Sequence, residues 1–315
     1  MKTTINSTQK KFIKYLWILL IVIVSSSFKG ISRKSADGDP LIEKEVSLKI
    51  VRKFFVKGTI ESIIIKMRIP TTKKNKQTVN SLSFSIQPDS IYTKEDNTYA
   101  VFRLRNVTDN FKLIVSGNIT IYNTINTQNV DTNINFAKYL MPEKFIECNH
   151  RDIKMAAKQL KGKYDIETVL NTYAFVDSSL KYEKNESVGA VEVLETGVGK
   201  CTDFSDLFVA LLRANKIPAK TIHGIVVDAN SNNPQHQWSE AYLQKQGWVR
   251  FDPTFRCPII KVGKNYEMKI RNTYIETGEG RNDSELKGWP LHYDYTSESY
   301  GGQVRMKEFF DVVSK

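Results

Sequence analysis

The stretch GVGKCTDFSDLFVALLRANKIPAK, residues 197–220, places a cysteine, Cys201, directly after a glycine-rich turn. Beyond Cys201, apolar residues recur at the spacing of a helix that faces a core. They are Phe204, Leu207, Phe208, Leu211 and Leu212. Asp203 and Asp206 lie near the start of this predicted helix, and Pro218 follows its end. Cys201 is therefore expected at a helix N-terminus, where free N–H groups and the helix dipole stabilise a thiolate, the reactive form of cysteine.

A thiolate nucleophile needs a base, and the segment around His236 can supply one. Residues 233–254, NPQHQWSEAYLQKQGWVRFDPT, are typical of two strands joined by a turn at 245–247. The start of the first strand of a hairpin lies beside the end of the second, so we predict that His236 and Asp252 are neighbours. Strand alternation puts His236, Trp238, Glu240 and Tyr242 on one face. A thiol, an imidazole and a carboxylate able to orient it are the parts of a Cys/His/Asp triad.

These blocks resemble the transglutaminase-like superfamily. The similarity rests on GVGKC with its helix and RANKIPAK end, then HQWSEAYL, then GWVRFDPT, within about Asp165 to Thr254. It implies a papain-like core in which a helix carrying the cysteine packs on an antiparallel sheet carrying the other two residues. It also implies that Cys201 is the nucleophile, His236 the base and Asp252 the orienting acid.

Such a triad predicts attack by Cys201 on a peptide or carboxamide carbonyl, followed by a thioester that water or an amine resolves. The expected function is a cysteine protease or amidase acting on a protein or peptide. The alternatives are a protein-glutamine gamma-glutamyltransferase that cross-links proteins, and a non-catalytic binding or assembly protein that retains the fold. Tyr182 and Trp238 are candidate oxyanion or cleft side chains beside the Cys201 N–H. Thr202 and Lys220 depart from the residues common in the family, and neither belongs to the triad.

The remaining cysteines offer one disulfide. Of the three cysteines in the chain, a free Cys201 leaves Cys148 and Cys257 as a candidate pair. The sequence has no CxxC motif and no His/Cys ligand spacing, so neither a metal site nor a cofactor is expected.

Bulk composition limits the partners. The chain has 315 residues, enough for two domains, and a net charge of +12. Its basic residues are scattered and form no stripe interleaved with aromatic residues, so a nucleic-acid partner is not expected. The sequence gives no indication of the oligomeric state.

Residues 1–30 are typical of an export signal. Lys10, Lys11 and Lys14 precede the apolar run YLWILLIVIV, and SSSFKG supplies small residues after it. The run is shorter than the roughly 20 residues of a spanning helix, so a cleaved signal is favoured over an N-terminal anchor at residues 15–28. Only an uncleaved leader would bring the chain into contact with a membrane. The chain is therefore expected to be exported, to the periplasm, the cell surface or the medium.

The predicted fold class is α+β, with a papain-like transglutaminase core preceded by an all-β sandwich. Residues 31–40 are polar and are predicted to be a linker. Residues 41–138 contain short β-branched and aromatic runs separated by turn clusters, the pattern of a sandwich. Residues 142–275 form the predicted core, beginning with a helix at 165–182. The polar, glycine-broken residues 276–315 are assigned to the core as a C-terminal extension.

Overall fold

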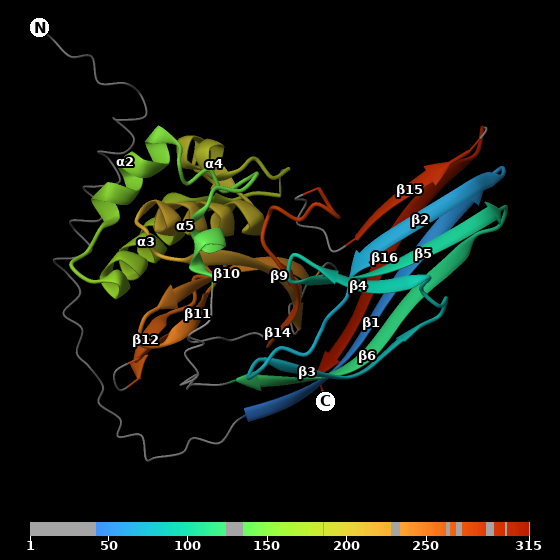
Figure 1. Ribbon diagram of the computed structural model, residues 1–315, viewed down its shortest axis with the longest axis horizontal. Coiled ribbons are helices and arrows are strands. Elements are labelled where there is room, and N and C mark those ends of the chain that lie inside the picture. Colours follow the sequence, from blue (N-terminus) through green and yellow to red (C-terminus); the bar gives the residue numbers. More distant parts are fainter. Residues whose placement is uncertain are drawn as a thin grey trace, which may run out of the picture.

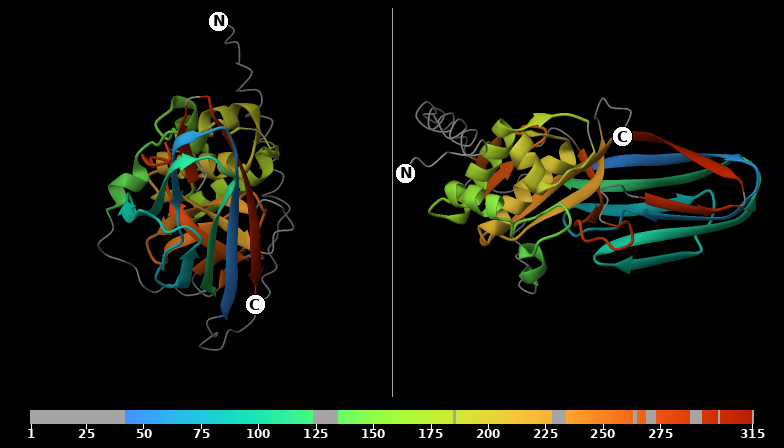
Figure 2. Two further views of the ribbon diagram at one scale, coloured as in Figure 1. Left: turned by 90° about the vertical axis from the view of Figure 1, so that its right-hand side faces the viewer. Right: turned by 90° about the horizontal axis from the view of Figure 1, so that it is seen from above.

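The computed structural model shows an elongated molecule with a helix-rich core at one end and a β-sandwich at the other (Figures 1 and 2). It describes residues 42–123, 135–184, 186–227, 234–262, 265–268, 273–287, 293–299 and 301–314. The predicted leader and linker lie outside these residues. Among the residues described, no helix has the length and apolar character needed to cross a membrane.

The sandwich consists of two antiparallel sheets, each with four strands, in the orders β16-β1-β6-β3 and β15-β2-β5-β4. Its strands are β1 (Ile42–Lys57), β2 (Ile60–Arg68), β3 (Gln77–Phe84), β4 (Ser90–Lys94), β5 (Asn97–Val107), β6 (Phe111–Asn123), β15 (Tyr293–Glu298) and β16 (Gln303–Ser314). Alternate residues such as Ile63, Ile65 and Met67 of β2 are buried between the sheets, as the period of a strand requires. The sequence analysis missed β4 because turn clusters border it on both sides.

The core contains a third four-stranded antiparallel sheet, β11-β10-β9-β14, with helices packed on it (Figure 1). Its helices are η1 (Phe136–Leu140), α2 (Arg151–Leu160), α3 (Asp165–Ser179), α4 (Ala190–Thr196) and α5 (Cys201–Ala214). Its strands are β7 (Lys181–Tyr182), β8 (Val198–Gly199), β9 (Ala219–Val227), β10 (Gln235–Leu243), β11 (Gly247–Phe251), β12 (Ile259–Val262), β13 (Asn265–Met268) and β14 (Thr273–Glu279). The structure thus confirms the α+β class. The helix predicted for 165–182 ends at Ser179, because the next residues pair with β8 instead.

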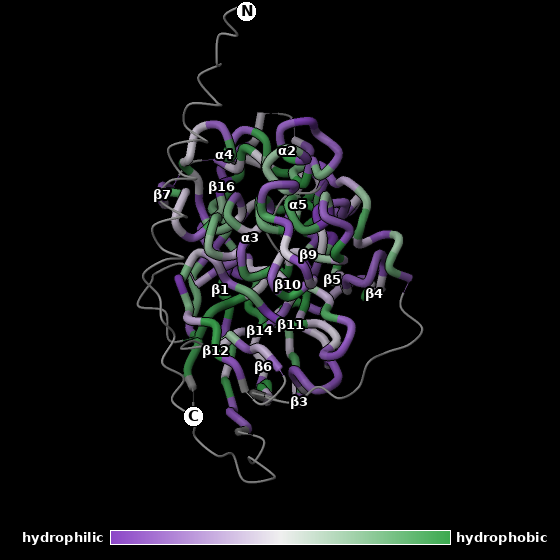
Figure 3. Tube along the Cα trace, turned by 90° about the vertical axis from the view of Figure 1, so that its left-hand side faces the viewer, coloured by the Kyte–Doolittle hydropathy of each residue, from purple (hydrophilic) through white to green (hydrophobic). Residues whose placement is uncertain are grey.

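Helix α5 is the centre of the core. Its apolar residues, including Leu207, Phe208 and Leu211, are fully buried against the other helices and the inner face of the sheet. A helix that is buried nearly all round is fixed in place by packing rather than by helix propensity. Seen from the helical end, apolar and polar residues alternate along the trace, as expected where each element buries one face (Figure 3).

The C-terminal strands correct one predicted domain boundary. The sequence analysis assigned residues 276–315 to the core, but β16 pairs with β1 along its whole length and β15 pairs with β2. Met306, Phe310 and Val312 of β16 pack against the sandwich core, while Phe309 and Val313, which alternate with them, are exposed. These strands complete one edge of each sandwich sheet, so the chain returns to its first domain after building the core.

The two domains share a packed interface. Ile225 and Val227 of β9 and Ile275 of β14 belong to the same apolar cluster as the sandwich interior. Beside this cluster, Asp283 accepts hydrogen bonds from Arg68 at the end of β2, and both side chains are fully buried. The sandwich therefore supports the sheet that carries the candidate site.

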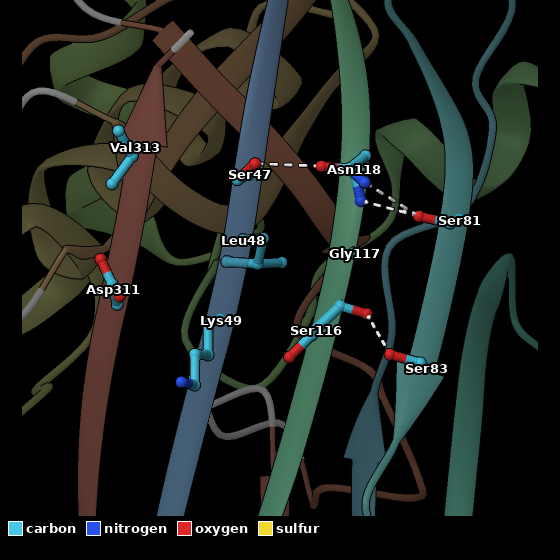
Figure 4. A pocket seen from close by; sticks show the side chains of 10 residues that line it. All are labelled: Ser47, Leu48, Lys49, Ser81, Ser83, Ser116, Gly117, Asn118, Asp311 and Val313. Atoms are coloured by element: carbon cyan, nitrogen blue, oxygen red, sulfur yellow. Dashed lines mark hydrogen bonds between the residues drawn. The ribbon is translucent and has the colours of Figure 1, made fainter.

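The outer face of the sandwich carries a shallow hollow of about 310 Å³ (Figure 4). Its polar side chains bond to one another: Ser47 donates to Asn118 over 3.0 Å, and Ser83 donates to the Ser116 carbonyl over 3.3 Å. The lining contains neither cysteine nor histidine. The nucleophile and base predicted from the sequence thus lie elsewhere, in the core.

Candidate active site

Cys201 is the first residue of α5, as predicted. Asp203, fully buried in the first turn, accepts a hydrogen bond from the Lys200 N–H over 3.0 Å through one oxygen and from the Val188 N–H over 3.0 Å through the other. These bonds fix the loop entering the helix. They leave the N–H of Cys201 as one of the first-turn donors that the helix itself cannot use.

The structure confirms that His236 and Asp252 are neighbours. The ladder between β10 and β11 ends at the pair Ser239–Phe251, so Asp252 follows the last paired residue. Its Oδ2 lies 2.7 Å from Nε2 of His236. Both side chains are buried, and this contact leaves Nδ1 as the ring nitrogen available to the thiol of Cys201, with which His236 is hydrogen-bonded.

The electrostatics favour a charged Cys–His pair. Burial disfavours the thiolate, but the hydrogen bond and positive charge of His236 and the backbone N–H of Gln237 outweigh it and lower the pKa of Cys201. Burial also disfavours the imidazolium, but the charge and hydrogen bond of Asp252, together with Cys201, raise the pKa of His236. Since the thiol pKa falls and the imidazole pKa rises, thiolate and imidazolium coexist over the pH range between them.

Polar contacts dock the start of α5 on β10. The amide of Gln237 donates to the Thr202 carbonyl over 3.1 Å and to Asp206 over 2.8 Å, and Ser205 donates to the Gln237 carbonyl over 3.0 Å. Gln237 directly follows His236 in β10, so the same strand positions the imidazole and the helix that carries the thiol. The sequence analysis did not single out Gln237, although its place inside the HQW motif was a signal.

Asp206, one of the two acidic residues near the start of α5, is fully buried and forms an ion pair with Arg281 over 3.2 Å. Burial raises the pKa of Asp206 to about 7 despite this partner. Arg281 lies just beyond β14, far from α5 in the sequence, so no local pattern indicated the contact.

Trp238 is packed in the sheet rather than exposed in a cleft. It is fully buried, and its ring centroid lies 4.8 Å from that of Tyr274 and 6.2 Å from that of His236. This corrects its prediction as a cleft residue, because a side chain without exposed surface cannot line a cleft. Its neighbour Tyr274, which the sequence analysis missed, donates to Oδ2 of Asp252 over 2.9 Å.

Gly224 makes room for this packing. A Cβ there would lie 2.0 Å from the carbonyl oxygen of Ile275 and 2.7 Å from the ring of Trp238. We expect Gly224→Ala to lower the free energy of unfolding by about 1–3 kcal/mol through overpacking, and to reduce the reactivity of Cys201. Urea unfolding and thiol alkylation measure the two effects.

The matched control is Gly197→Ala. A Cβ at Gly197 meets nothing closer than 3.5 Å, but its φ of 72° favours glycine. This variant should lose about 1 kcal/mol through backbone strain alone and keep the reactivity of Cys201. Equal loss of reactivity in both variants would show that the packing at Gly224 has no special relation to the site.

Two exposed aromatic side chains flank the thiol and the imidazole. Tyr182, 46% exposed, pairs through β7 with Gly199 immediately before α5, and its charge interaction with Cys201 places it near the thiol. Phe255, 41% exposed, has its ring centroid 4.6 Å from that of His236 and covers one side of the imidazole. Tyr182 thus lies where a cleft residue was predicted, whereas Phe255 follows Asp252 in a loop that the motifs did not mark.

The predicted disulfide between Cys148 and Cys257 is absent: all three cysteines lie in the described part of the chain, and none of them forms a disulfide. The sulfur of Cys148 lies 3.7 Å from the Leu140 carbonyl oxygen. Burial raises the pKa of Cys148, and the nearby positive charge of Arg213, near the end of α5, opposes this shift. The Cys257 carbonyl accepts a hydrogen bond from Tyr173, which also binds the Asp252 carbonyl near the start of α5. The two thiols therefore lie toward opposite ends of the central helix, which the sequence could not reveal.

Comparisons with known proteins agree with this architecture. Residues 154–253 match the family model described as the transglutaminase-like superfamily. The relatives include "Uncharacterized protein YebA" of Bacillus subtilis, 32% identical over 98 residues, and an "Uncharacterized protein" of Haemophilus influenzae, 40% identical over 88 residues. These alignments cover 27% and 20% of this chain and only 13% and 24% of the relatives' own lengths.

A solved structure from Cytophaga hutchinsonii, described provisionally as a cysteine protease, shares the fold with a TM-score of 0.62 at 14% identity. The likeness covers 86% of this chain and 91% of that one, so it includes the sandwich as well as the core. Together with the family match and the placement of the thiol, imidazole and carboxylate, it identifies residues 154–253 as a core of the transglutaminase-like superfamily.

Proposed function

We propose that the chain is a cysteine hydrolase that cleaves peptide or carboxamide bonds through a thioester on Cys201. The observation that carries the proposal is the position of His236 between Asp252 and Cys201. Its Nε2 lies 2.7 Å from the carboxylate of Asp252, and its ring is also hydrogen-bonded to the thiol of Cys201. In this arrangement the imidazole can hold or release a proton beside a thiolate, while the carboxylate fixes its orientation.

In the first step the thiolate of Cys201 attacks the carbonyl carbon, and the carbonyl oxygen takes up the negative charge. The N–H of Cys201 at the start of α5 is the donor placed to bind that oxyanion. His236 then donates its proton to the departing nitrogen, the C–N bond breaks, and a thioester remains on the sulfur.

In the second step a water molecule attacks the thioester carbon. The now neutral imidazole of His236 accepts a proton from the water, and the C–S bond breaks to release the acid and the thiolate. An amine in place of the water would give transfer rather than hydrolysis. Asp252 stays ionised throughout and orients the ring.

The proposal predicts that Cys201 reacts at acidic pH. Because the pKa of the thiol is lowered and that of His236 is raised, alkylation by iodoacetamide should proceed well below pH 7 rather than only near the free-thiol value of about 8.5. Cys148 and Cys257 are buried, and Cys201→Ser supplies the blank that identifies the labelled residue. Alkylation that begins only near the free-thiol value would contradict the proposed thiolate–imidazolium pair.

A second measurement separates hydrolysis from transfer. The full chain is incubated with an unfolded protein substrate, with and without a small primary amine, and the products are analysed by mass spectrometry. We expect new peptide termini or deamidated side chains as the main products in both cases, and none with Cys201→Ala. Predominant incorporation of the amine would indicate a cross-linking enzyme, and a reactive thiol without any product would favour the binding or assembly role.

We also propose that the chain acts outside the cytoplasm. The support is the sequence of the leader, in which lysines precede a short apolar run followed by small residues. A fusion of residues 1–40 to a reporter that is active only after export tests this proposal, with Leu19→Arg in the apolar run as the control expected to abolish export.

A further inference from the structure

We propose that Tyr274 is a positioning residue of the candidate active site, whose hydroxyl holds the carboxylate of Asp252 in place opposite His236. The inference rests on the proposed function, since it assigns a role within the same triad. It concerns a residue from a distant strand, β14, that no motif of the core includes.

The carboxylate of Asp252 is held by three donors. Oδ2 accepts from Nε2 of His236 over 2.7 Å and from the hydroxyl of Tyr274 over 2.9 Å, while Oδ1 accepts from the Thr254 N–H over 3.1 Å. Asp252 is fully buried and Tyr274 nearly so. Without the hydroxyl, Oδ2 would keep only the imidazole, and water could not replace the lost donor without entering a packed site.

The packing around Tyr274 is specific for this orientation. Its ring meets Trp238 edge-on at 4.8 Å, and the guanidinium of Arg250 lies 5.0 Å from its centroid. Glu276 holds that guanidinium through a 3.1 Å contact. Gly224 in turn allows Trp238 to approach β14. The phenol is thus packed against Trp238 and Arg250, and its hydroxyl binds the same oxygen that binds His236.

The groups that face Asp252 come from every element packed around it. His236 of β10, Tyr274 of β14, Tyr173 of α3 and Cys201 of α5 interact with Asp252 itself, while Arg250 of β11 and Cys257 after β11 interact with Tyr274. Tyr173 binds the backbone carbonyl of Asp252 rather than its carboxylate, over 3.1 Å. Tyr274 is therefore the tyrosine that acts on the charge of Asp252, and Tyr173 acts on its backbone.

The test is the pH profile of Cys201 alkylation by iodoacetamide in the full chain carrying Tyr274→Phe. The hydroxyl fixes Oδ2 of Asp252 opposite Nε2 of His236, so its loss leaves the carboxylate free to turn and weakens the hydrogen bond that stabilises the imidazolium. Because Asp252 raises the pKa of His236, we expect the basic limb of the alkylation profile, where the imidazolium loses its proton, to move down by about one pH unit. Where a cleavable peptide is in hand, kcat should fall about tenfold with KM unchanged.

Tyr173→Phe is the matched control, because it removes a similarly buried hydroxyl that binds only backbone carbonyls near the same residue. It should lower the melting temperature and leave the basic limb in place. A Tyr274→Phe profile that coincides with the wild type, or that shifts no more than Tyr173→Phe, would overturn the inference.

A double variant guards against a general loss of structure. In a chain that already carries Asp252→Asn, adding Tyr274→Phe should cause no further shift of the basic limb, because the carboxylate through which the hydroxyl acts is gone. A further shift of equal size would show that Tyr274 acts through packing alone. If the wild type itself shows no reactivity at acidic pH, the proposed function fails first, which distinguishes the two failures.

Discussion

Replacement of His236 by alanine is expected to lower kcat/KM for peptide hydrolysis by about 10⁴-fold or more. The imidazole is the group bonded both to the thiol and, at 2.7 Å, to Asp252, so its loss removes the charge that lowers the pKa of Cys201 and the proton donor for the leaving nitrogen. The buried carboxylate is also left facing a cavity. Alkylation of Cys201 should then require pH values near that of a free thiol, about 8.5.

The control is His150→Ala. His150 is exposed and caps α2, where its ring accepts a 3.4 Å hydrogen bond from the Asp152 N–H. Loss of this cap should cost about 1 kcal/mol of stability without any change in turnover. Retention of more than about one per cent of wild-type kcat/KM by the His236 variant would exclude it as the base, because removal of such a residue costs far more.

The chemistry of the site was predictable because the triad lies on contiguous local patterns. A helix period after Cys201 and a hairpin between His236 and Asp252 each follow from spacing alone, and the structure contains both elements. Local geometry alone was therefore enough to predict that an imidazole lies beside a carboxylate. The nearness of the helix to the hairpin came instead from the family resemblance.

What the sequence could not supply were contacts between segments far apart in the chain. Contacts of this kind are made by Tyr274, Arg281 and strand β16, whose partners lie tens to hundreds of residues away in the chain. The sequence around these residues is polar and interrupted by glycines, which is the pattern of a loop. Even where a segment has the pattern of a strand, that pattern does not say which sheet the strand joins. The predicted disulfide was wrong for the same reason, because a pairing depends on the distance between two loops, which the sequence does not give.

The second large effect is expected at the junction of the two domains. Asp283→Ala should lower the free energy of unfolding by about 3–5 kcal/mol, because it leaves the guanidinium of Arg68 buried without its partner. Asp283 accepts from Nε of Arg68 over 2.8 Å and from Nη2, and both side chains have no exposed surface. It also accepts from the N–H groups of Glu285 over 2.8 Å and Leu286 over 3.0 Å, so the turn after β14 should loosen as well. Urea unfolding followed by tryptophan fluorescence measures the loss.

Two further variants separate the effect of the unpaired buried charge from other causes of lost stability. Glu183→Ala breaks an exposed 2.8 Å ion pair with Lys181 and should change stability by no more than about 0.5 kcal/mol. Replacing both partners, as Arg68→Met with Asp283→Leu, removes the charge together with its counterion and should recover most of the lost stability. Failure of the double variant to recover would locate the loss in the turn at Glu285 and Leu286 rather than in the unpaired guanidinium. In either case the sandwich and the core should unfold in one transition, because Ile225 and Ile275 of the core sheet lie in the apolar cluster of the sandwich.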